Sequence, residues 1–177
     1  MLQALDEEYL GCDVQFGGID QRKIFMFART WMPKLGYKKR AYIMNSLIPG
    51  LSESGKMSSS EPLSKIELHE SEEALKSKLA NAFMGGKKTA EGNGVLAIIC
   101  HILFPFLNAR DEHGYFDCSG KRFYAYVDLE NAFNDGTVLN DELTSACADL
   151  LIQLLHPLRV FWCKNKDLYD MAYSTGC

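Results

Sequence analysis

The sequence predicts an α/β piece followed by a mainly helical piece, and three observations support this division. Residues 1–50 show a strand–helix–strand order, which is typical of a partial Rossmann-like parallel sheet. Residues 51–66 form a loop rich in serine that cannot pack a core. Residues 67–177 mostly carry helical patterns. We therefore expect a partial sheet, a functional loop and a helical domain.

The first piece divides into four elements. Residues 3–10 have the pattern of a helix end, and residues 14–16 that of a short strand. Between residues 20 and 32, apolar side chains recur at helical spacing, and Pro33 follows near the end of that pattern. Residues 40–44 alternate and predict a second strand. A helix between two strands favours a parallel pair.

The second piece is expected to be helical with one extended arm. A helix capped by Ser71 should run to about Phe83, with two acidic residues favourably placed in its first turn. The apolar run 94–104 predicts a buried helix. The remaining expectations are an irregular segment 110–120, a strand at 122–127, a long helix at 141–155 capped by Asn140, and a short helix at 164–173.

The loop GKMSSSEPLSKI (residues 55–66) places Lys56 among hydroxyl-bearing residues, of which Ser58, Ser59 and Ser60 follow it closely. Lysine provides a point charge for phosphate oxygens, and hydroxyl and backbone N–H groups donate hydrogen bonds to them. The loop therefore favours polyphosphate binding. The alternative is an ordinary solvated loop.

A second motif, GGIDQ, follows the first predicted strand. Glycines such as Gly18 allow the backbone to approach a ligand closely. Polar residues at the carboxyl end of a parallel strand lie where open α/β sheets bind nucleotides. Asp20 could therefore accept hydrogen bonds from ribose hydroxyls, or it could cap the following helix. The sequence leaves both roles open.

Composition limits the possible partners. The chain has 177 residues and a formal charge of −4, so any RNA contact must come from local basic clusters. Six scattered cysteines lack zinc-site spacing, and we find neither a signal peptide nor an apolar run of membrane length. These observations favour a reducing, cytoplasmic setting without a membrane partner. The basic clusters are Lys38-Lys39-Arg40, Lys87-Lys88, Lys121-Arg122 and the group Arg159, Lys164 and Lys166.

Taken together, QALDEEYL (residues 3–10), GGIDQ and KMSSS resemble the C-terminal half of tyrosyl-tRNA synthetase of the eukaryotic/archaeal kind, a class I aminoacyl-tRNA synthetase. The resemblance covers nearly the whole chain. It implies that residues 1–50 are the C-terminal part of a Rossmann-type catalytic domain, that residues 51–66 are the KMSSS loop, and that residues 67–177 are a helical anticodon-binding domain.

The resemblance also implies an activity. ATP, with Mg²⁺, would activate tyrosine to tyrosyl-adenylate, which is passed to tRNA-Tyr; ATP and Mg²⁺ act as substrate, and no tightly bound cofactor or metal site is expected. Catalysis is then positioning and stabilisation of phosphate charge. The implied tyrosine-binding residues are Gln3, Asp6 and Gln21, with Asp6 as a buried acceptor for the phenolic OH. The implied adenylate-binding residues are Gly18, Asp20, Met44 and Lys56, and the catalytic loop residues are Lys56, Ser58, Ser59 and Ser60. Met44 is almost as well explained as a core residue.

For the helical domain, the resemblance implies that an anticodon base stacks on an aromatic ring and is read by a carboxylate at a helix start. Glu142, with Asp141 beside it, takes the carboxylate position, although LNDELT lacks the family's His-Pro. The aromatic residue is either Tyr115 or Phe116, of which we choose Phe116. Helix capping is a full alternative for Asp141.

The four histidines form no HIGH-type motif, so the resemblance implies that this chain starts after the half that carries it. A partial sheet also exposes an apolar face and strand edges. We expect the chain alone to be inactive and poorly soluble without a missing N-terminal half, a homodimer partner or both. The alternative is a non-catalytic, synthetase-derived RNA-binding or regulatory protein. An unrelated nucleotidyltransferase is the third hypothesis, and QALDEEYL disfavours it.

Overall fold

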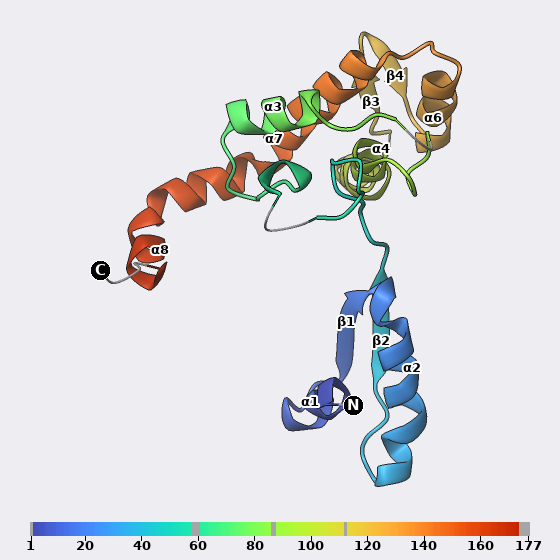
Figure 1. Ribbon diagram of the computed structural model, residues 1–177, viewed down its shortest axis with the longest axis vertical. Helices are drawn as coiled ribbons and strands as arrows, with labels where there is room; N and C mark the ends of the chain where they lie inside the picture. Colours follow the sequence, from blue (N-terminus) through green and yellow to red (C-terminus); the bar gives the residue numbers. More distant parts are fainter. Residues whose placement is uncertain (1, 58–60, 86–87, 112, 174–177) are drawn as a thin grey trace. The chain divides into compact units, whose positions relative to one another are not determined.

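The computed structural model describes residues 2–57, 61–85, 88–111 and 113–173. The chain forms two compact units, Met1–Leu47 and Ile48–Cys177, and each is described separately. Figure 1 labels their helices and strands.

The first unit contains one strand–helix–strand motif. Helix α1 (Leu2–Tyr9) precedes strand β1 (Val14–Gly18), which leads through a 3₁₀ turn, η1 (Ile19–Gln21), into α2 (Arg22–Trp31). A second 3₁₀ turn, η2 (Pro33–Leu35), precedes β2 (Ala41–Asn45). β1 and β2 pair in parallel, which confirms the small parallel sheet predicted from the sequence.

The two faces of this sheet differ in their surroundings. On one face, the ring of Tyr42 stacks on Phe25 of α2 with centroids 5.1 Å apart. The opposite face carries Val14, Phe16 and Ile43, of which Phe16 is 69% exposed and Ile43 55% exposed. Phe16 and Ile43 are direct partners across the two strands. The apolar exposed face expected for a partial sheet is therefore confirmed.

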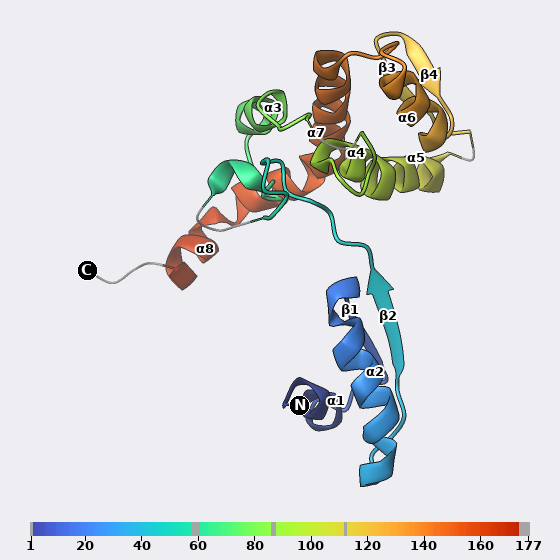
Figure 2. The same ribbon diagram turned by 45° about the vertical axis from the view of Figure 1, so that its right-hand side comes forward.

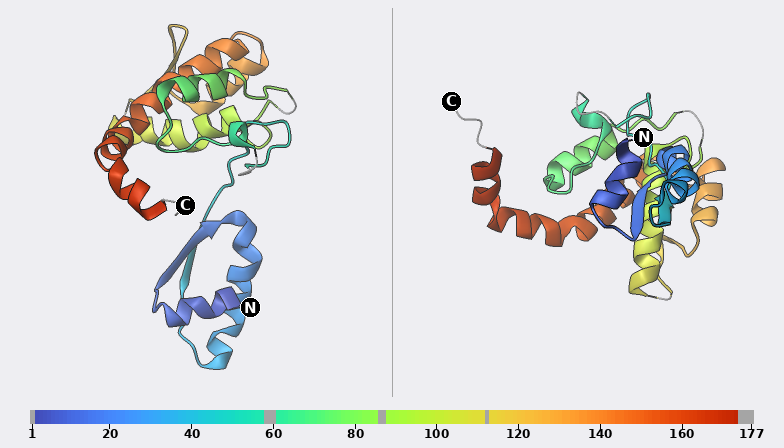
Figure 3. Two further views of the ribbon diagram at one scale, coloured as in Figure 1. Left: turned by 60° about the vertical axis from the view of Figure 1, so that its left-hand side comes forward. Right: turned by 90° about the horizontal axis from the view of Figure 1, so that it is seen from below.

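The second unit is mainly helical and has a continuous core (Figure 2). Helix α3 (Glu72–Ala80) packs along α7 (Asn140–Lys164). The predicted cap of α3 is confirmed, because Ser71 Oγ accepts a hydrogen bond from Ala74 N at 3.1 Å. A 3₁₀ turn, η3 (Pro62–Ser64), precedes α3, and α8 (Lys166–Tyr173) follows α7 at an angle (Figure 3).

The buried helix predicted at 94–104 begins as expected and extends further. Asn93 Oδ1 caps it by accepting hydrogen bonds from the backbone N–H groups of Val95 and Leu96, at 2.9 and 3.1 Å. The helix consists of α4 (Gly94–Ile98), a π-helical turn η4 (Ile99–Leu103) and α5 (Phe104–Arg110). Pro105 follows the π turn, and the looser hydrogen-bond ladder accommodates its missing N–H.

Three sequence predictions for this unit need correction. The segment 110–120 contains a strand, β3 (Phe116–Cys118), which pairs antiparallel with β4 (Lys121–Phe123) in a tight hairpin. A helix that was not predicted, α6 (Tyr126–Asn134), replaces the second half of the expected strand. Tertiary burial explains both, because Phe116, Cys118, Leu129 and Phe133 all enter the core.

Helix α7 is the third correction, because it spans 25 residues and ends at Lys164 rather than near Leu155. Asn140 is its first residue and Leu139 holds the cap position. The expectation that the chain has no apolar run of membrane length is wrong at α7, which is long and apolar enough to cross a membrane, although core helices pass the same test. Its side chains Leu143, Leu151 and Leu155 are buried in the core of the second unit, which explains the apolar composition.

Candidate functional site

In the first unit, four of the predicted site residues meet at the carboxyl end of β1. The side chain of Gln3 on α1 donates a hydrogen bond from Nε2 to Oε1 of Gln21 at 2.8 Å. Gly18 ends β1, and Asp20 and Gln21 lie in the turn that follows it. This is the edge at which parallel α/β sheets bind ligands.

The two glycines of this edge are closely covered by polar side chains. A methyl group added at Gly17 would lie 3.0 Å from Gln21 Oε1, and one added at Gly18 would lie 2.4 Å from Asp20 Oδ1. The carboxamide and the carboxylate therefore fold back over the glycine backbone. Asp20 caps neither the 3₁₀ turn nor α2, since the cap positions are Gly18 and Gln21. The capping alternative for Asp20 is wrong.

Helix α1 presents Gln3 and Asp6 on one face, because they are three residues apart. The buried face of the helix carries Ala4 and Glu7, and Glu7 is 1% exposed. Asp6 itself is exposed in this chain. Asp6 therefore lies beside Gln3 on the exposed face of α1, whereas Glu7 is the buried carboxylate of DEE; the burial of Asp6 around a bound tyrosine stays a prediction.

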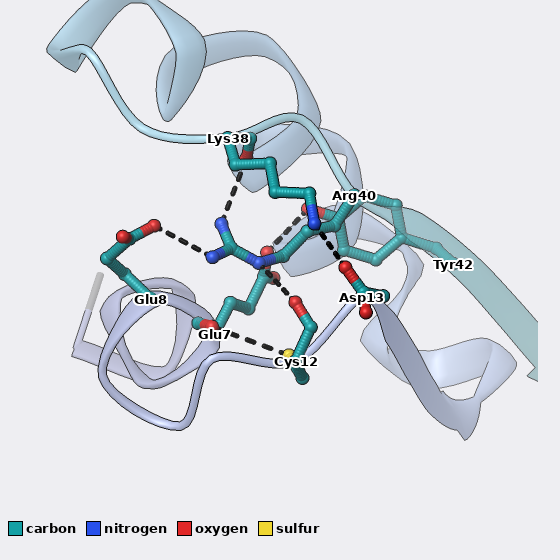
Figure 4. A network of polar contacts seen from close by, with 7 residues as sticks. All are labelled: Glu7, Glu8, Cys12, Asp13, Lys38, Arg40 and Tyr42. Atoms are coloured by element: carbon teal, nitrogen blue, oxygen red, sulfur yellow. Dashed lines mark hydrogen bonds and ion pairs between the residues drawn. The ribbon is translucent and has the colours of Figure 1, made fainter.

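A polar network fixes α1 to β2 (Figure 4). Tyr42 OH donates to Glu7 Oε2 at 2.7 Å, and burial together with this bond raises the pKa of Tyr42. Arg40 Nη2 donates to Glu8 Oε2 at 2.7 Å, and Arg40 Nε donates to Cys12 O at 2.7 Å. Sequence reasoning missed this network, because it treated Arg40 as part of a basic surface cluster. The network positions Gln3 opposite Gln21.

Met44 is half-buried in β2, directly opposite Gly17. It lies one residue before the end of its strand, so it belongs to the same carboxyl edge as Gly18. Its side chain shares the face of the sheet that α2 covers, since strand residues alternate and Tyr42 lies on that face. This position is compatible with a core role and with contact to a ligand at the edge.

In the second unit, Lys56 lies on a loop with a fixed base. Leu51 is 3% exposed in the core, and its backbone N–H donates to Ser64 O at 2.9 Å. Gly50 allows close packing, because an added methyl group would lie 2.7 Å from Lys56 O. Lys56 is exposed, and no described residue forms an ion pair with it. Ser58, Ser59 and Ser60 lie outside the described residues.

The second unit also contains a cavity of about 1050 Å³ between the end of α5, the hairpin and the start of α7. Asp141, Glu142, Tyr115 and Phe116 all line it. Five lining residues are acidic and one, Arg110, is basic, so the cavity repels phosphate but can accept hydrogen bonds from a base. The acidic residues are Asp111, Asp117, Asp141, Glu142 and Asp149.

The residues predicted to read a base differ in their exposure and in how many hydrogen bonds they already form within the protein. Glu142 Oε2 accepts a hydrogen bond from Leu139 N at 2.8 Å, and this bond and one from the Ser119 side chain lower the pKa of Glu142. The helix-capping role therefore belongs to Glu142 rather than Asp141, which is exposed. Phe116 is 1% exposed and stacks on Phe104, which makes it a poor platform for a base. Tyr115 is 36% exposed.

Two of the basic clusters are partly internal. Arg40 is 7% exposed and pairs with Glu8, and Arg159 is 9% exposed and pairs with Glu72 at 2.9 Å. Neither can contact RNA without breaking its ion pair. Arg122 is exposed. In the part of the chain that the structure describes, no group of three His, Cys, Asp or Glu side chains could hold a metal ion.

This small parallel sheet followed by helices is found in the class I tRNA synthetases. The family model described as "tRNA synthetases class I (W and Y)" matches residues 1–156, and the chain belongs to this family. Similar proteins include the cytoplasmic tyrosine–tRNA ligases of Gallus gallus (47% identical over 89% of this chain) and Saccharomyces cerevisiae (36% over 97%). The chain spans only 30% and 46% of the length of these two relatives.

Solved structures agree with this assignment. Tyrosyl-tRNA synthetase from Aeropyrum pernix superposes with a TM-score of 0.75 at 33% identity, covering 89% of this chain and 46% of that one. The enzyme from Pyrococcus horikoshii, complexed with L-tyrosine, gives a TM-score of 0.82 at 26% identity, covering 98% of this chain and 54% of that one. A tryptophanyl-tRNA synthetase from Giardia lamblia gives 0.57 at 27% identity, covering 81% and 33%.

Proposed function

We propose that this chain is part of a cytoplasmic tyrosine–tRNA ligase, which activates tyrosine with ATP and transfers it to tRNA-Tyr. The names of its relatives support the reaction and the compartment. The observation that carries the proposal is the hydrogen bond between Gln3 and Gln21 beside Gly18, at the ligand-binding edge of the sheet. Two segments far apart in sequence thus converge on one place.

In this proposal, Gln3 and Gln21 hold the ammonium end of tyrosine, and their mutual bond is exchanged for bonds to the substrate. Asp6, on the same face of α1 as Gln3, accepts from the phenolic OH once ligand and neighbouring chain cover it. A site built to pair with this hydroxyl rejects phenylalanine, and discrimination of about 10⁵-fold is already established for tyrosyl-tRNA synthetases. Gly18 and Asp20 contact the ribose, and Met44 lies near the adenine.

Lys56 is proposed to stabilise charge on the phosphates of ATP, which enters with Mg²⁺ as substrate. The fixed base of its loop at Leu51 and Ser64 leaves the ammonium group exposed and unpaired among the described residues. Ser58, Ser59 and Ser60 are proposed to add donors. No general acid or base is required, since positioning and charge stabilisation suffice for this transfer.

The cavity of the second unit is proposed to bind an anticodon base, which makes residues 67–177 an anticodon-binding domain. Acceptor oxygens of Asp141 and Glu142 suit a base edge that offers N–H donors, as guanine does. Tyr115 replaces Phe116 as the stacking residue, because Phe116 is buried. Glu142 already accepts hydrogen bonds from the Leu139 backbone and the Ser119 side chain, so the exposed Asp141 carboxylate is the more accessible acceptor of the two.

The test is aminoacylation of tRNA-Tyr by the full chain mixed with the N-terminal half that family members carry. We expect charging by the mixture and no tyrosine-dependent pyrophosphate exchange by the chain alone. Lys56→Ala should slow activation about 100-fold and leave tRNA affinity unchanged, whereas Lys34→Ala, at an exposed lysine of the first unit outside the basic clusters, should change neither. tRNA binding without charging by the mixture would instead support a non-catalytic RNA-binding protein.

A further inference from the structure

The β3–β4 hairpin carries a cation, Arg122, and is followed by an aromatic ring, Tyr124, and the base-reading role of the cavity uses neither. The guanidinium carbon of Arg122 lies 4.5 Å from the ring centroid of Tyr115. The rings of Tyr115 and Tyr124 have centroids 5.8 Å apart and an interplanar angle of 58°. We call Tyr115, Arg122 and Tyr124 the hairpin platform. Tyr124 is 58% exposed, the more open of the two rings.

The hairpin holds this platform rigidly, because its alternate residues enter the core. Phe116 and Cys118 are buried, and Phe123, which pairs with Phe116, packs against the same core. Asp117 and Arg122 are the opposite pair, and they point outward. The platform is therefore built on ordered backbone rather than on a free loop, and ordering it on binding costs little entropy.

The charge on Arg122 is available to a ligand. No carboxylate of the described residues lies within ion-pair distance of it, although Asp117 faces it across the hairpin. Asp117 Oδ1 instead accepts from Gly120 N at 3.1 Å. A guanidinium that rests on an aromatic ring and lacks a counter-ion is suited to a phosphate.

The platform adjoins the cavity, because Tyr115 lines that cavity and touches both other members. The two places differ in charge: the cavity is acidic and the platform is cationic. The acidic cavity accepts hydrogen bonds from a base but repels a phosphate, whereas the cationic platform attracts a phosphate. A single base in the cavity therefore leaves the platform empty. A strand of RNA can satisfy both, with one base in the cavity and the next nucleotide on the platform.

We propose that the hairpin platform binds a second unpaired nucleotide of the same RNA loop, with its base stacked on Tyr124 and its phosphate paired with Arg122. This inference rests on the proposed function, in which the cavity takes an anticodon base. Stacking on aromatic side chains and arginine is the usual way in which proteins hold splayed bases. The platform thereby sets the direction in which the RNA strand leaves the cavity.

The experiment measures binding of the full chain to a hairpin RNA with the anticodon stem and loop of tRNA-Tyr, by fluorescence anisotropy. Tyr124→Ala should weaken binding roughly 5- to 100-fold, and Tyr124→Phe should retain most of the affinity. Arg122→Ala should weaken binding and lower the slope of log affinity against log salt by about 1. Tyr9→Ala and Arg29→Ala, both exposed in the first unit, are matched controls and should bind as the wild type does.

Abasic substitutions in the loop locate the contact. Removing the base at one position next to the cavity nucleotide should weaken binding of the wild type and leave binding of the Tyr124→Ala variant unaffected. Both changes remove the same stacking contact, so their effects should not add. If the wild type binds and the platform variants bind equally well, the platform inference is overturned and the proposed function stands. If the loss of binding free energy caused by Tyr124→Ala adds to the loss caused by the abasic substitution at every position tested, no base of the loop stacks on Tyr124 and the inference is overturned. If the wild type does not bind the RNA hairpin, both proposals fail.

Discussion

Different interactions stabilise the interior of each of the two units. Among its described residues, the second unit buries nineteen in one continuous hydrophobic cluster, drawn mainly from α3, the helix α4–η4–α5, the hairpin, α6 and α7. The first unit buries a cluster of only three, Ala4, Ala28 and Met32, and relies on the polar network around Glu7 and Arg40. It also leaves Phe16 and Ile43 uncovered. The predicted tyrosine-binding residues thus lie on the unit with the smaller core, and the predicted catalytic residue Lys56 lies on the unit with the larger one.

This contrast shows that the proposed tyrosine site of the first unit and the proposed base-binding cavity of the second rest on different kinds of interaction. A core of packed apolar side chains gains free energy in proportion to the area removed from water, so the second unit can stabilise itself. Forty-seven residues with a three-residue cluster fall near the limit at which a chain folds alone. Directional hydrogen bonds then decide where α1 lies.

The largest expected effect is in the core of the second unit. Leu96 is 0% exposed in α4, and Leu96→Ala should destabilise that unit by about 2–5 kcal/mol through lost burial and a residual cavity. Urea denaturation followed by circular dichroism measures this change. Leu47→Ala, at a residue of the first unit that is 56% exposed, should have little effect. A comparable loss in both variants would mean that burial does not distinguish the two units.

The polar network of the first unit should give an intermediate effect. Tyr42→Phe removes the hydroxyl that donates to the buried carboxylate of Glu7, at a cost of about 1–3 kcal/mol. Amide hydrogen exchange should increase in α1 and β2 and stay unchanged in α7. Tyr37→Phe is the control, because Tyr37 is half-buried in the same unit but forms no hydroxyl hydrogen bond in the described structure. Equal exchange in the two variants would contradict the role of the network.

The smallest effect is a pH dependence at the start of α7. Hydrogen bonds from Leu139 N and the Ser119 side chain lower the pKa of Glu142 below its ordinary value of 4.5. The ionised carboxylate therefore adds stability above pH 4.5, and this gain is lost as the pH falls through the lower folded-state value. Glu142→Gln should reduce the stability at neutral pH slightly and flatten the profile between pH 5 and pH 3. An unchanged profile in Glu142→Gln would show that the cap does not titrate.

The sequence predicted local features well where neighbours in the chain decide them. The parallel pair, the Ser71 cap and the start of the buried helix at Gly94 follow from periodicity, capping chemistry and apolar runs. The prediction failed at α6 and β3, whose short amphipathic patterns are ambiguous until the core that covers them is known. Of the GGIDQ motif, Asp20 and Gln21 lie in the turn after β1 as predicted, whereas Gly17 and Gly18 belong to the strand itself.

The sequence by itself determined which residues share a face: Gln3 with Asp6 on α1, and Tyr42 with Met44 on β2. Helical and strand periods fix these relations without reference to the rest of the fold. Only the tertiary structure decided which of those faces is covered. It buried Glu7 instead of Asp6, placed Arg40 inside an ion pair and turned Phe116 into the core while Tyr115 stayed open. Burial depends on which distant segments pack against a face, and local spacing carries no record of that choice.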